Sequence, residues 1–87
     1  MRNLYRTCGI QNAINDDYKY AKEILKCFGK YTQMNWGDTS ESDCRANDNA
    51  VYTNEKVIAK YITSKGNIFI ITEWDRSATT ILFAHER

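Results

Sequence analysis

The chain has 87 residues, room for one small domain, which we expect to span 1–87. With 43% hydrophobic and 26% charged residues, its composition is that of a globular protein and excludes an intrinsically disordered chain. The formal net charge of +1 argues against both a strongly basic nucleic-acid binder and an acidic mimic of DNA.

The N-terminal segment, which contains Asn3 and Arg6, lacks the apolar stretch of a signal peptide. No apolar run elsewhere approaches the roughly 20 residues that a membrane span needs. We therefore expect a soluble cytoplasmic protein with no membrane partner.

The first predicted element is an amphipathic helix from Asn15 to Phe28. Acidic and amide residues at 15–17 are suited to cap its start, and Gly29 is suited to end it. The same apolar spacing extends upstream over 8–14, so the helix either begins earlier or follows a shorter one. Its apolar residues recur every three or four positions, and lysines occupy the opposite face: the apolar set is Ala21, Ile24, Leu25 and Phe28, and the lysines are Lys19, Lys22 and Lys26.

A second, shorter helix is predicted to start at Asp38 or Ser40, which with an acidic residue three positions on resembles a capping box. It should extend to about Asn49. Because the chain contains no proline, glycine and Asx residues must supply the turns, and we look for them at Gly29, Gly37 and Gly66.

The C-terminal half contains three runs rich in β-branched and aromatic residues: Val57 to Thr63, Asn67 to Glu73, and Ala78 to Ala84. The links between them are short, so neighbouring strands can pair only antiparallel. The predicted fold is therefore α+β, with an N-terminal helix and a short second helix packed on a three-stranded antiparallel meander.

Both faces of the predicted central strand carry large apolar side chains, with Ile68 and Ile70 on one face and Phe69 and Ile71 on the other. The first helix is expected to cover one face. The second face needs the middle segment, the N-terminal residues or a partner chain, because an uncovered apolar face marks an interaction site.

The cysteines Cys8, Cys27 and Cys44 are odd in number and widely spaced, without a C-x-x-C pair. Free thiols fit this pattern best. A zinc site formed by the three cysteines and His85 is the alternative, since thiolate and imidazole are preferred zinc ligands. We expect no cofactor.

The charge is unevenly distributed, with +3 over residues 1–35, −4 over 36–55 and +2 over 56–87. The near-neutral total is thus a cancellation. The acidic middle segment is either a solvated polar face or a surface complementary to a basic partner.

The run Trp36-Gly37-Asp38, then Asp43 and Asn47-Asp48, is followed by a block from Ile70 to Phe83 that contains Thr-Glu-Trp-Asp-Arg-Ser. Over roughly residues 12–86 these motifs resemble small proteins encoded by phages and mobile elements of Gram-positive bacteria, often labelled plasmid-related. Small proteins from that setting frequently inhibit host defence. By this analogy the resemblance implies an anti-CRISPR inhibitor that contacts a CRISPR effector in the bacterial cytoplasm.

The candidate partner-binding residues combine aromatic and arginine anchors, which dominate interface hot spots, with carboxylates suited to a basic nucleic-acid channel. A structural interpretation stays open for the turn, where Asp75 would bond backbone amides and Arg76 would pair with a carboxylate, such as Asp43 or Asp48. The candidate set is Trp36, Asp38, Glu41, Asp43, Asp48, Trp74, Asp75 and Arg76.

Three other hypotheses remain. Clustered carboxylates would hold Mg²⁺ in a small nuclease, but no phosphate loop or catalytic histidine pattern accompanies them, so we expect no enzyme and no catalytic residue. The second sheet face or an edge strand would mediate self-association. DNA binding would use the lysine face of the first helix: Lys19, Lys22, Lys26 and Lys30.

Overall fold

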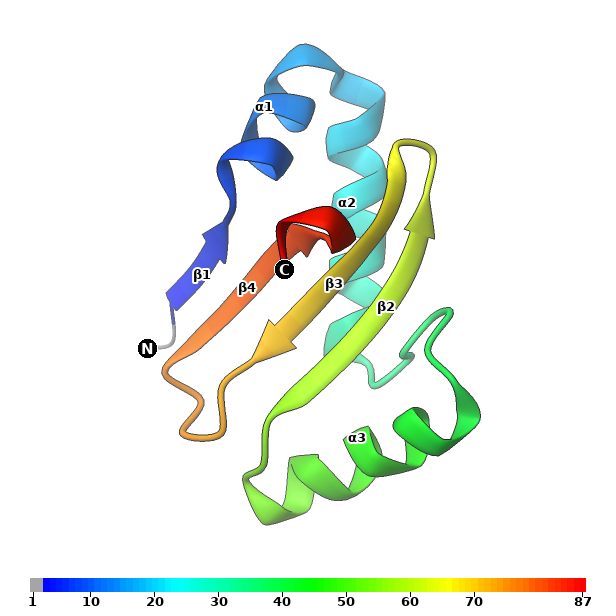
Figure 1. The fold of residues 1–87 in the computed structure, drawn as a ribbon, viewed down its shortest axis with the longest axis vertical. Helices are drawn as coiled ribbons and strands as arrows, with labels where there is room; N and C mark the ends of the chain where they lie inside the picture. Colours follow the sequence, from blue (N-terminus) through cyan, green and yellow to red (C-terminus); the bar gives the residue numbers. More distant parts are fainter. Residues whose placement is uncertain (1–2) are drawn as a thin grey trace.

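The computed structural model describes residues 3–87 and has an α+β architecture, with three helices and a four-stranded mixed sheet (Figure 1). No helix of the described residues is long and apolar enough to cross a membrane. The elements, in chain order, are β1 (Asn3–Arg6), α1 (Cys8–Asp16), α2 (Tyr18–Thr32), α3 (Glu41–Thr53), β2 (Val57–Thr63), β3 (Gly66–Thr72), β4 (Ala78–Phe83) and a 3₁₀ turn η1 (Ala84–Glu86).

The sheet has the strand order β1-β4-β3-β2. Strands β2, β3 and β4 form the predicted antiparallel meander, with Tyr61 opposite Ile68 and Ile70 opposite Ile81. The prediction that the sheet has three strands was nevertheless wrong, because β1 adds a fourth strand parallel to β4. Sequence patterns miss β1 because it has only four residues, all exposed, and pairs with a strand at the far end of the chain.

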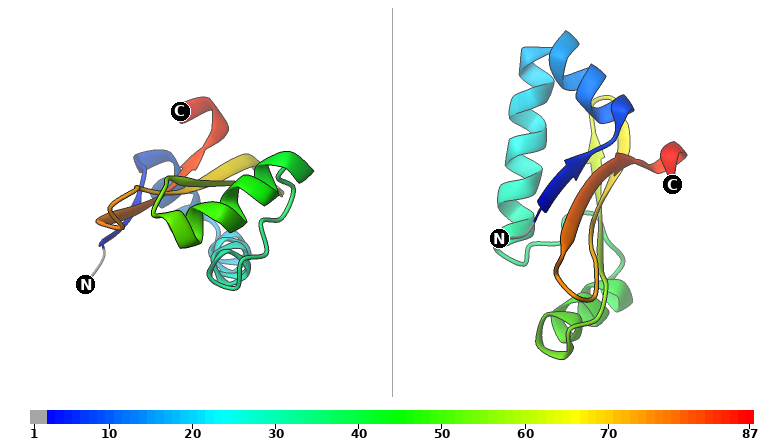
Figure 2. Two further views of the ribbon diagram at one scale, coloured as in Figure 1. Left: turned by 90° about the horizontal axis from the view of Figure 1, so that it is seen from below. Right: turned by 90° about the vertical axis from the view of Figure 1, so that its left-hand side faces the viewer.

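Helix α2 packs on one face of the sheet, and η1 lies on the other (Figure 2). The buried side chains of α2 pack against those of the strands. Ile24 and Cys27 belong to the same hydrophobic cluster as Ile68 and Ile70. The predicted helix therefore packs on one face of the sheet, as expected, but covers only part of it.

Asp17 separates α1 from α2. Its carboxylate accepts hydrogen bonds from the N–H groups of Lys19 and Tyr20, and its own N–H closes α1 by donating to Ala13. Of the two predicted alternatives, a shorter preceding helix is therefore the one observed.

The prediction that Gly29 ends the helix was wrong. Helix α2 continues through it to Thr32, because Tyr31 is a core residue whose hydroxyl bonds Thr72 at 2.6 Å. The reversal is made instead by Met34, at φ 62°, while the N–H of Asn35 donates to the carbonyl of Lys30.

Helix α3 begins at the predicted cap, where the hydroxyl of Ser40 accepts from the N–H of Asp43. It extends four residues beyond Asn49, to Thr53, and ends at Asn54 in the left-handed conformation. The segment 47–49 consists of Asn and Asp, which are poor helix formers, and it is tolerated because Asn47 is buried and bonded to the sheet.

The second sheet face is partly covered. Ile71 and Leu82 are 8% exposed, and the guanidinium of Arg87 lies 5.1 Å from the ring centre of Phe69. The segment Ala84–Glu86 turns onto this face (Figure 2). Ile62, at the β2 edge, stays exposed.

Candidate functional site

Trp36 is a core residue, so the expectation that it is an exposed anchor was wrong. Its side chain is 6% exposed and packs edge-on against the ring of Tyr31 at 5.4 Å. The indole N–H donates to Asp48 Oδ1 at 2.8 Å. Asp48, predicted to face a partner, therefore satisfies a buried donor.

Asp38 closes the outer edge of β2. Its N–H donates to the carbonyl of Lys60, and its Oδ2 accepts from the N–H of Ile62 at 2.8 Å. Beside it, the Thr39 hydroxyl accepts from the N–H of Lys60, also at 2.8 Å. The predicted contact residue Asp38 thus protects a strand edge that would otherwise be open to pairing.

Asn47 bonds the main chain of β2 at the same outer edge. Its amide donates to the carbonyl of Ile58 at 2.8 Å and accepts from the N–H of the same residue at 3.2 Å. The side chain is 4% exposed. The sequence motif around Asn47-Asp48 is therefore explained by its attachment of α3 to β2 and to Trp36.

Two further predicted acidic residues lie at the first turn of α3. Glu41 pairs with Arg45 at 3.1 Å, and both side chains are exposed. Asp43 is exposed, and its main-chain N–H bonds the Ser40 cap. All four predicted carboxylates are exposed, but those of Asp38 and Asp48 also accept hydrogen bonds from the fold, which leaves Glu41 and Asp43 as the two that bond no main-chain or core group among the described residues.

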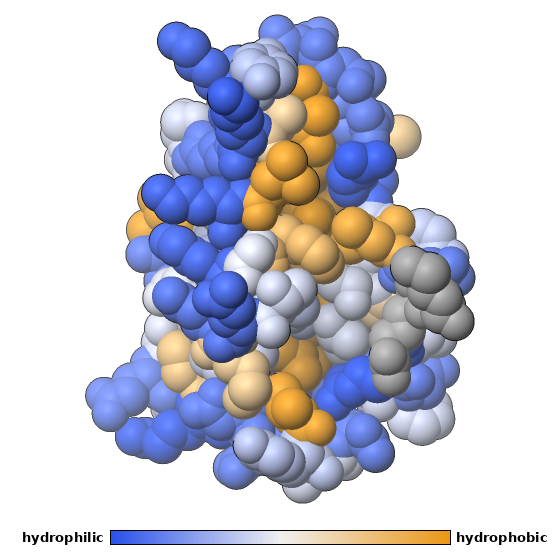
Figure 3. Space-filling model, turned by 180° about the vertical axis from the view of Figure 1, so that it is seen from behind, coloured by the Kyte–Doolittle hydropathy of each residue, from blue (hydrophilic) through white to orange (hydrophobic). Residues whose placement is uncertain are grey.

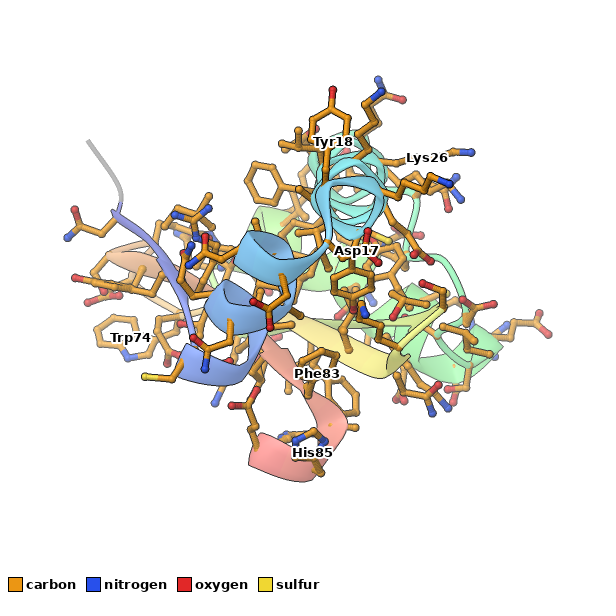
Figure 4. All side chains as sticks on the ribbon, turned by 90° about the horizontal axis from the view of Figure 1, so that it is seen from above. Asp17, Tyr18, Lys26, Trp74, Phe83 and His85 are labelled. Carbon is orange, nitrogen blue, oxygen red and sulfur yellow. The ribbon has the colours of Figure 1, made fainter. Side chains whose placement is uncertain are left out.

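The hairpin between β3 and β4 contains the remaining candidates, Trp74, Asp75 and Arg76. Asp75 accepts from the N–H of Ser77 at 3.0 Å, and hydrogen bonds from Ser77 hold the pKa of this carboxyl below its usual value. Trp74 is 65% exposed and lies on the β1 side of the molecule (Figure 4). Trp74 is thus the only tryptophan of the two that is available to a partner.

Arg76 connects the hairpin to α3 through carbonyl groups instead of the predicted carboxylates. Its guanidinium donates to the carbonyls of Ala50 at 2.6 Å, Glu55 at 2.7 Å and Glu73 at 3.2 Å. The positive charge therefore lies at the C-terminal end of α3, where the helix dipole favours a cation.

The cysteines and His85 are dispersed. Cys8 is exposed at the start of α1, Cys27 is in the core and Cys44 is half-buried on α3. Burial raises the pKa of the Cys27 thiol, and desolvation with the nearby Asp48 carboxylate raises that of Cys44. Within residues 3–87, no three His, Cys, Asp or Glu side chains gather closely enough to hold a metal ion.

The lysine face of α2 is exposed. Tyr18 and Lys26 point away from the sheet, and the ammonium of Lys22 lies 4.8 Å from the ring centre of Tyr18 (Figure 4). Lys19 and Lys30 are exposed too, whereas Glu23 on the same helix bonds Ser64 in the β2–β3 turn. This surface is an ordinary solvated helix face interrupted by a carboxylate.

An open polar hollow of about 660 Å³ lies between α3 and the second sheet face. Its charged lining is mixed, because two carboxylates of the middle segment share it with three basic side chains. The charged residues in this lining are Asp38, Asp43, Lys56, Lys60 and Arg87. Such a balance does not favour a ligand of either charge.

The apolar surface that sequence analysis missed runs along α2, from strands β1 and β4 at one end to α3 and the adjoining ends of β2, β3 and β4 at the other. We call it the α2 groove. It consists of two hollows of about 390 and 160 Å³ that share Phe28. Figure 3 shows apolar residues gathered in a band along this face. Its main apolar lining residues are Leu4, Ile14, Leu25, Phe28, Met34 and Val51.

Leu25 is the most exposed of the large apolar residues that line the α2 groove, at 69%, and Leu4 is 49% exposed. The helical period made Leu25 look like a core residue, but it projects beside the sheet and not onto it. The sequence did contain a signal for this exposed surface. The apolar stripe on this helix is wider than the part of a helix that packing on one sheet face can bury.

Comparisons with protein-family models, with curated proteins and with solved structures gave no match to this chain. The surfaces described above are therefore the basis for inferring function.

Proposed function

We propose that this chain is a non-catalytic binding module that acts by contacting another protein. The observation that carries the proposal is the α2 groove, in which the large apolar side chains Leu4 and Leu25 stay exposed beside Phe28. Contiguous exposed apolar surface on a small protein typically marks an interaction site.

The chemistry of the polar candidates supports binding over catalysis. Asp38, Asp48, Asp75 and Arg76 bond groups of the fold itself, which is a structural use. Trp74 is the exposed aromatic side chain suited to anchor a partner.

The resemblance to phage and mobile-element proteins makes a host defence complex the proposed partner, with a CRISPR effector first. In this proposal the chain inhibits the effector by contact. The exposed acidic residues Glu41 and Asp43 would meet the basic rim of a nucleic-acid channel as a secondary contact.

The test is retention of purified CRISPR effectors on the immobilised chain, combined with the effect of the free chain on target-DNA cleavage. Leu25→Glu should weaken retention about tenfold or more, because it places a charge in the apolar contact. Ile62→Glu is the matched control, since Ile62 is 62% exposed but lies at the far edge of the sheet, and it should bind like the parent.

Asp43→Lys tests the acidic surface separately, because the Asp43 carboxylate bonds no group of the fold among the described residues. A salt-sensitive loss of retention is expected. If no effector is retained and cleavage proceeds unchanged, a defence complex is the wrong partner; if Leu25→Glu and Ile62→Glu behave alike, the α2 groove is the wrong surface.

A further inference from the structure

We infer that the α2 groove receives an amphipathic helix with acidic flanks, which lies alongside α2 over strands β4 and β1. This inference rests on the proposed binding function and names the chemistry of the partner segment. It follows from the width, the length and the charge of the groove.

The width of the groove corresponds to one helix. Four strands spaced about 4.8 Å apart give the sheet a width of roughly 19 Å, of which one packed helix covers about 10 Å. Helix α2 packs on side chains of β2 and β3, such as Tyr61 and Ile68. Its flank and the strands β4 and β1 then bound the hollow that holds Leu4, Leu25 and Ile81. A second helix position on the sheet is left open.

The length of the groove corresponds to about three helical turns. Along α2 its lining extends from Ala21 to Thr32, a rise of roughly 16 Å at 1.5 Å per residue. A docked helix would place apolar residues at i, i+3 or i+4, and i+7 against Leu25, Phe28 and Met34. Helix α1 contributes Ile14 and closes the upper end.

The charge of the groove favours an acidic partner. Among the described residues, those that line it include Arg6 and Arg76 and no carboxylate. Lys22 adds a further positive charge on the outward side of α2. Glutamate or aspartate beside the apolar face of the docked helix would therefore be attracted, and lysine would be repelled.

The positive charge of the groove also argues against a second copy of this chain that would dock there with its own α2. The exposed face of that helix carries Lys19, Lys22, Lys26 and Lys30, which would meet Arg6. Like charges juxtaposed across an interface are unfavourable.

Strand addition at β1 is the other competing mode. The N–H groups of Asn3 and Thr7 donate toward β4, so the main-chain groups of Leu4 and Arg6 point to the open edge. A strand added there would extend the floor of the groove and leave the hollow above β4 unfilled. A helix fills this hollow and buries Leu25.

The test uses two synthetic peptides of about 15 residues, each held helical by a side-chain staple. Both carry leucine at the same i, i+4, i+7 and i+11 positions, and their flanks are glutamate in one and lysine in the other. Binding of each peptide to the full chain is measured by fluorescence anisotropy. We expect the acidic peptide to bind about tenfold tighter than the basic one.

Leu25→Lys should weaken binding of the acidic peptide about tenfold even though it adds an attractive charge, because the apolar contact is lost. Ile62→Lys, remote from the groove, should leave binding unchanged, and Arg6→Glu should reduce or reverse the preference for acidic flanks. Circular dichroism of each variant checks that the fold is retained.

Equal affinity for the two peptides, preference for the basic one, or no binding of either up to about 1 mM would overturn the inference. Equal binding of a proline-interrupted acidic peptide would point to strand addition instead. A concentration-dependent mass in light scattering that Leu25→Lys abolishes would identify a second copy as the occupant. No host protein takes part, so a failure with defence complexes is distinguishable from a failure here.

Discussion

Gly37 determines how closely the middle segment approaches the sheet. Its φ of +63° is in the left-handed region, and a Cβ built on it would lie 2.4 Å from the ring of Tyr61. Tyr61 cannot easily yield, because it is 2% exposed and its hydroxyl donates to the carbonyl of Asn35 at 2.7 Å. Glycine at this position lets Asp38 reach the β2 edge.

Gly37→Ala should lower the free energy of unfolding by about 2–4 kcal/mol, from the unfavourable φ and the overlap with Tyr61 together. Gly29→Ala is the matched control: Gly29 is exposed within α2 with nothing within 4 Å of its Cβ position, and the change should stabilise by about 0.5–1 kcal/mol. Urea unfolding followed by tryptophan fluorescence measures both. Equal effects of the two substitutions would contradict the role assigned to Gly37.

At the scale of elements, α3 is held at two points. Asn47 attaches its middle to β2, and Arg76 attaches its C-terminal end to the β3–β4 hairpin. The helix itself is a weak one, with many residues that prefer turns, so these tertiary bonds stabilise it more than its own propensity does.

Arg76→Lys should destabilise the protein by about 1.5–3 kcal/mol, because a lysine ammonium cannot reach several carbonyls in the planar arrangement of a guanidinium. Hydrogen exchange of the α3 amides should accelerate before that of β3. Arg45→Lys on the exposed face of α3 is the control and should change stability by less than about 0.5 kcal/mol. Uniform acceleration in both helix and sheet would argue against a local attachment.

At the scale of the whole molecule, Glu86 joins the C-terminal segment to the start of α1. Its carboxylate accepts from the hydroxyl of Thr7 at 2.6 Å and from the N–H groups of Phe83 at 3.0 Å and Gly9 at 3.2 Å. The Thr7 hydroxyl and the Phe83 N–H hold the pKa of Glu86 below its usual value of 4.5. A carboxyl whose pKa is lowered on folding stabilises the protein above its unfolded pKa and loses that contribution as pH falls through the folded value.

Glu86→Gln should therefore reduce stability at neutral pH and make the fall in stability below pH 4.5 shallower than in the parent. Thermal unfolding measured from neutral pH to about pH 3 tests this. Gly9→Ala should have a similar effect, because its Cβ would lie 2.6 Å from Glu86 Oε2 and displace the carboxylate. If the fall in stability below pH 4.5 is unchanged in both variants, the Glu86 carboxylate is not the group that causes it.

Local signals in the sequence predicted several elements correctly. The strand Val57–Thr63 was predicted with its observed bounds, and Ser40 was among the two residues proposed to cap α3. Asp17 was within the predicted capping segment. Strand alternation and N-caps depend on neighbours within a few residues, so they can be recognised without tertiary information.

Several of the predicted site residues take part in the fold, because the same residue types serve binding and folding. Trp36 is of a residue type common in interface hot spots, yet its ring is in the core and its indole N–H donates to Asp48. Leu25 looked like a core residue and is exposed in the α2 groove. The choice between these roles depends on which side chains the fold brings together.

The sequence by itself determined the α+β class, the three antiparallel strands and the acidic character of the middle segment, since these follow from periodicity, link length and charge. Only the tertiary structure decided that β1 joins β4, that α3 is bonded to an edge strand, and that α2 covers one half of a sheet face. These features join residues far apart in the chain, and their energy comes from shared burial and from hydrogen bonds that no local pattern records.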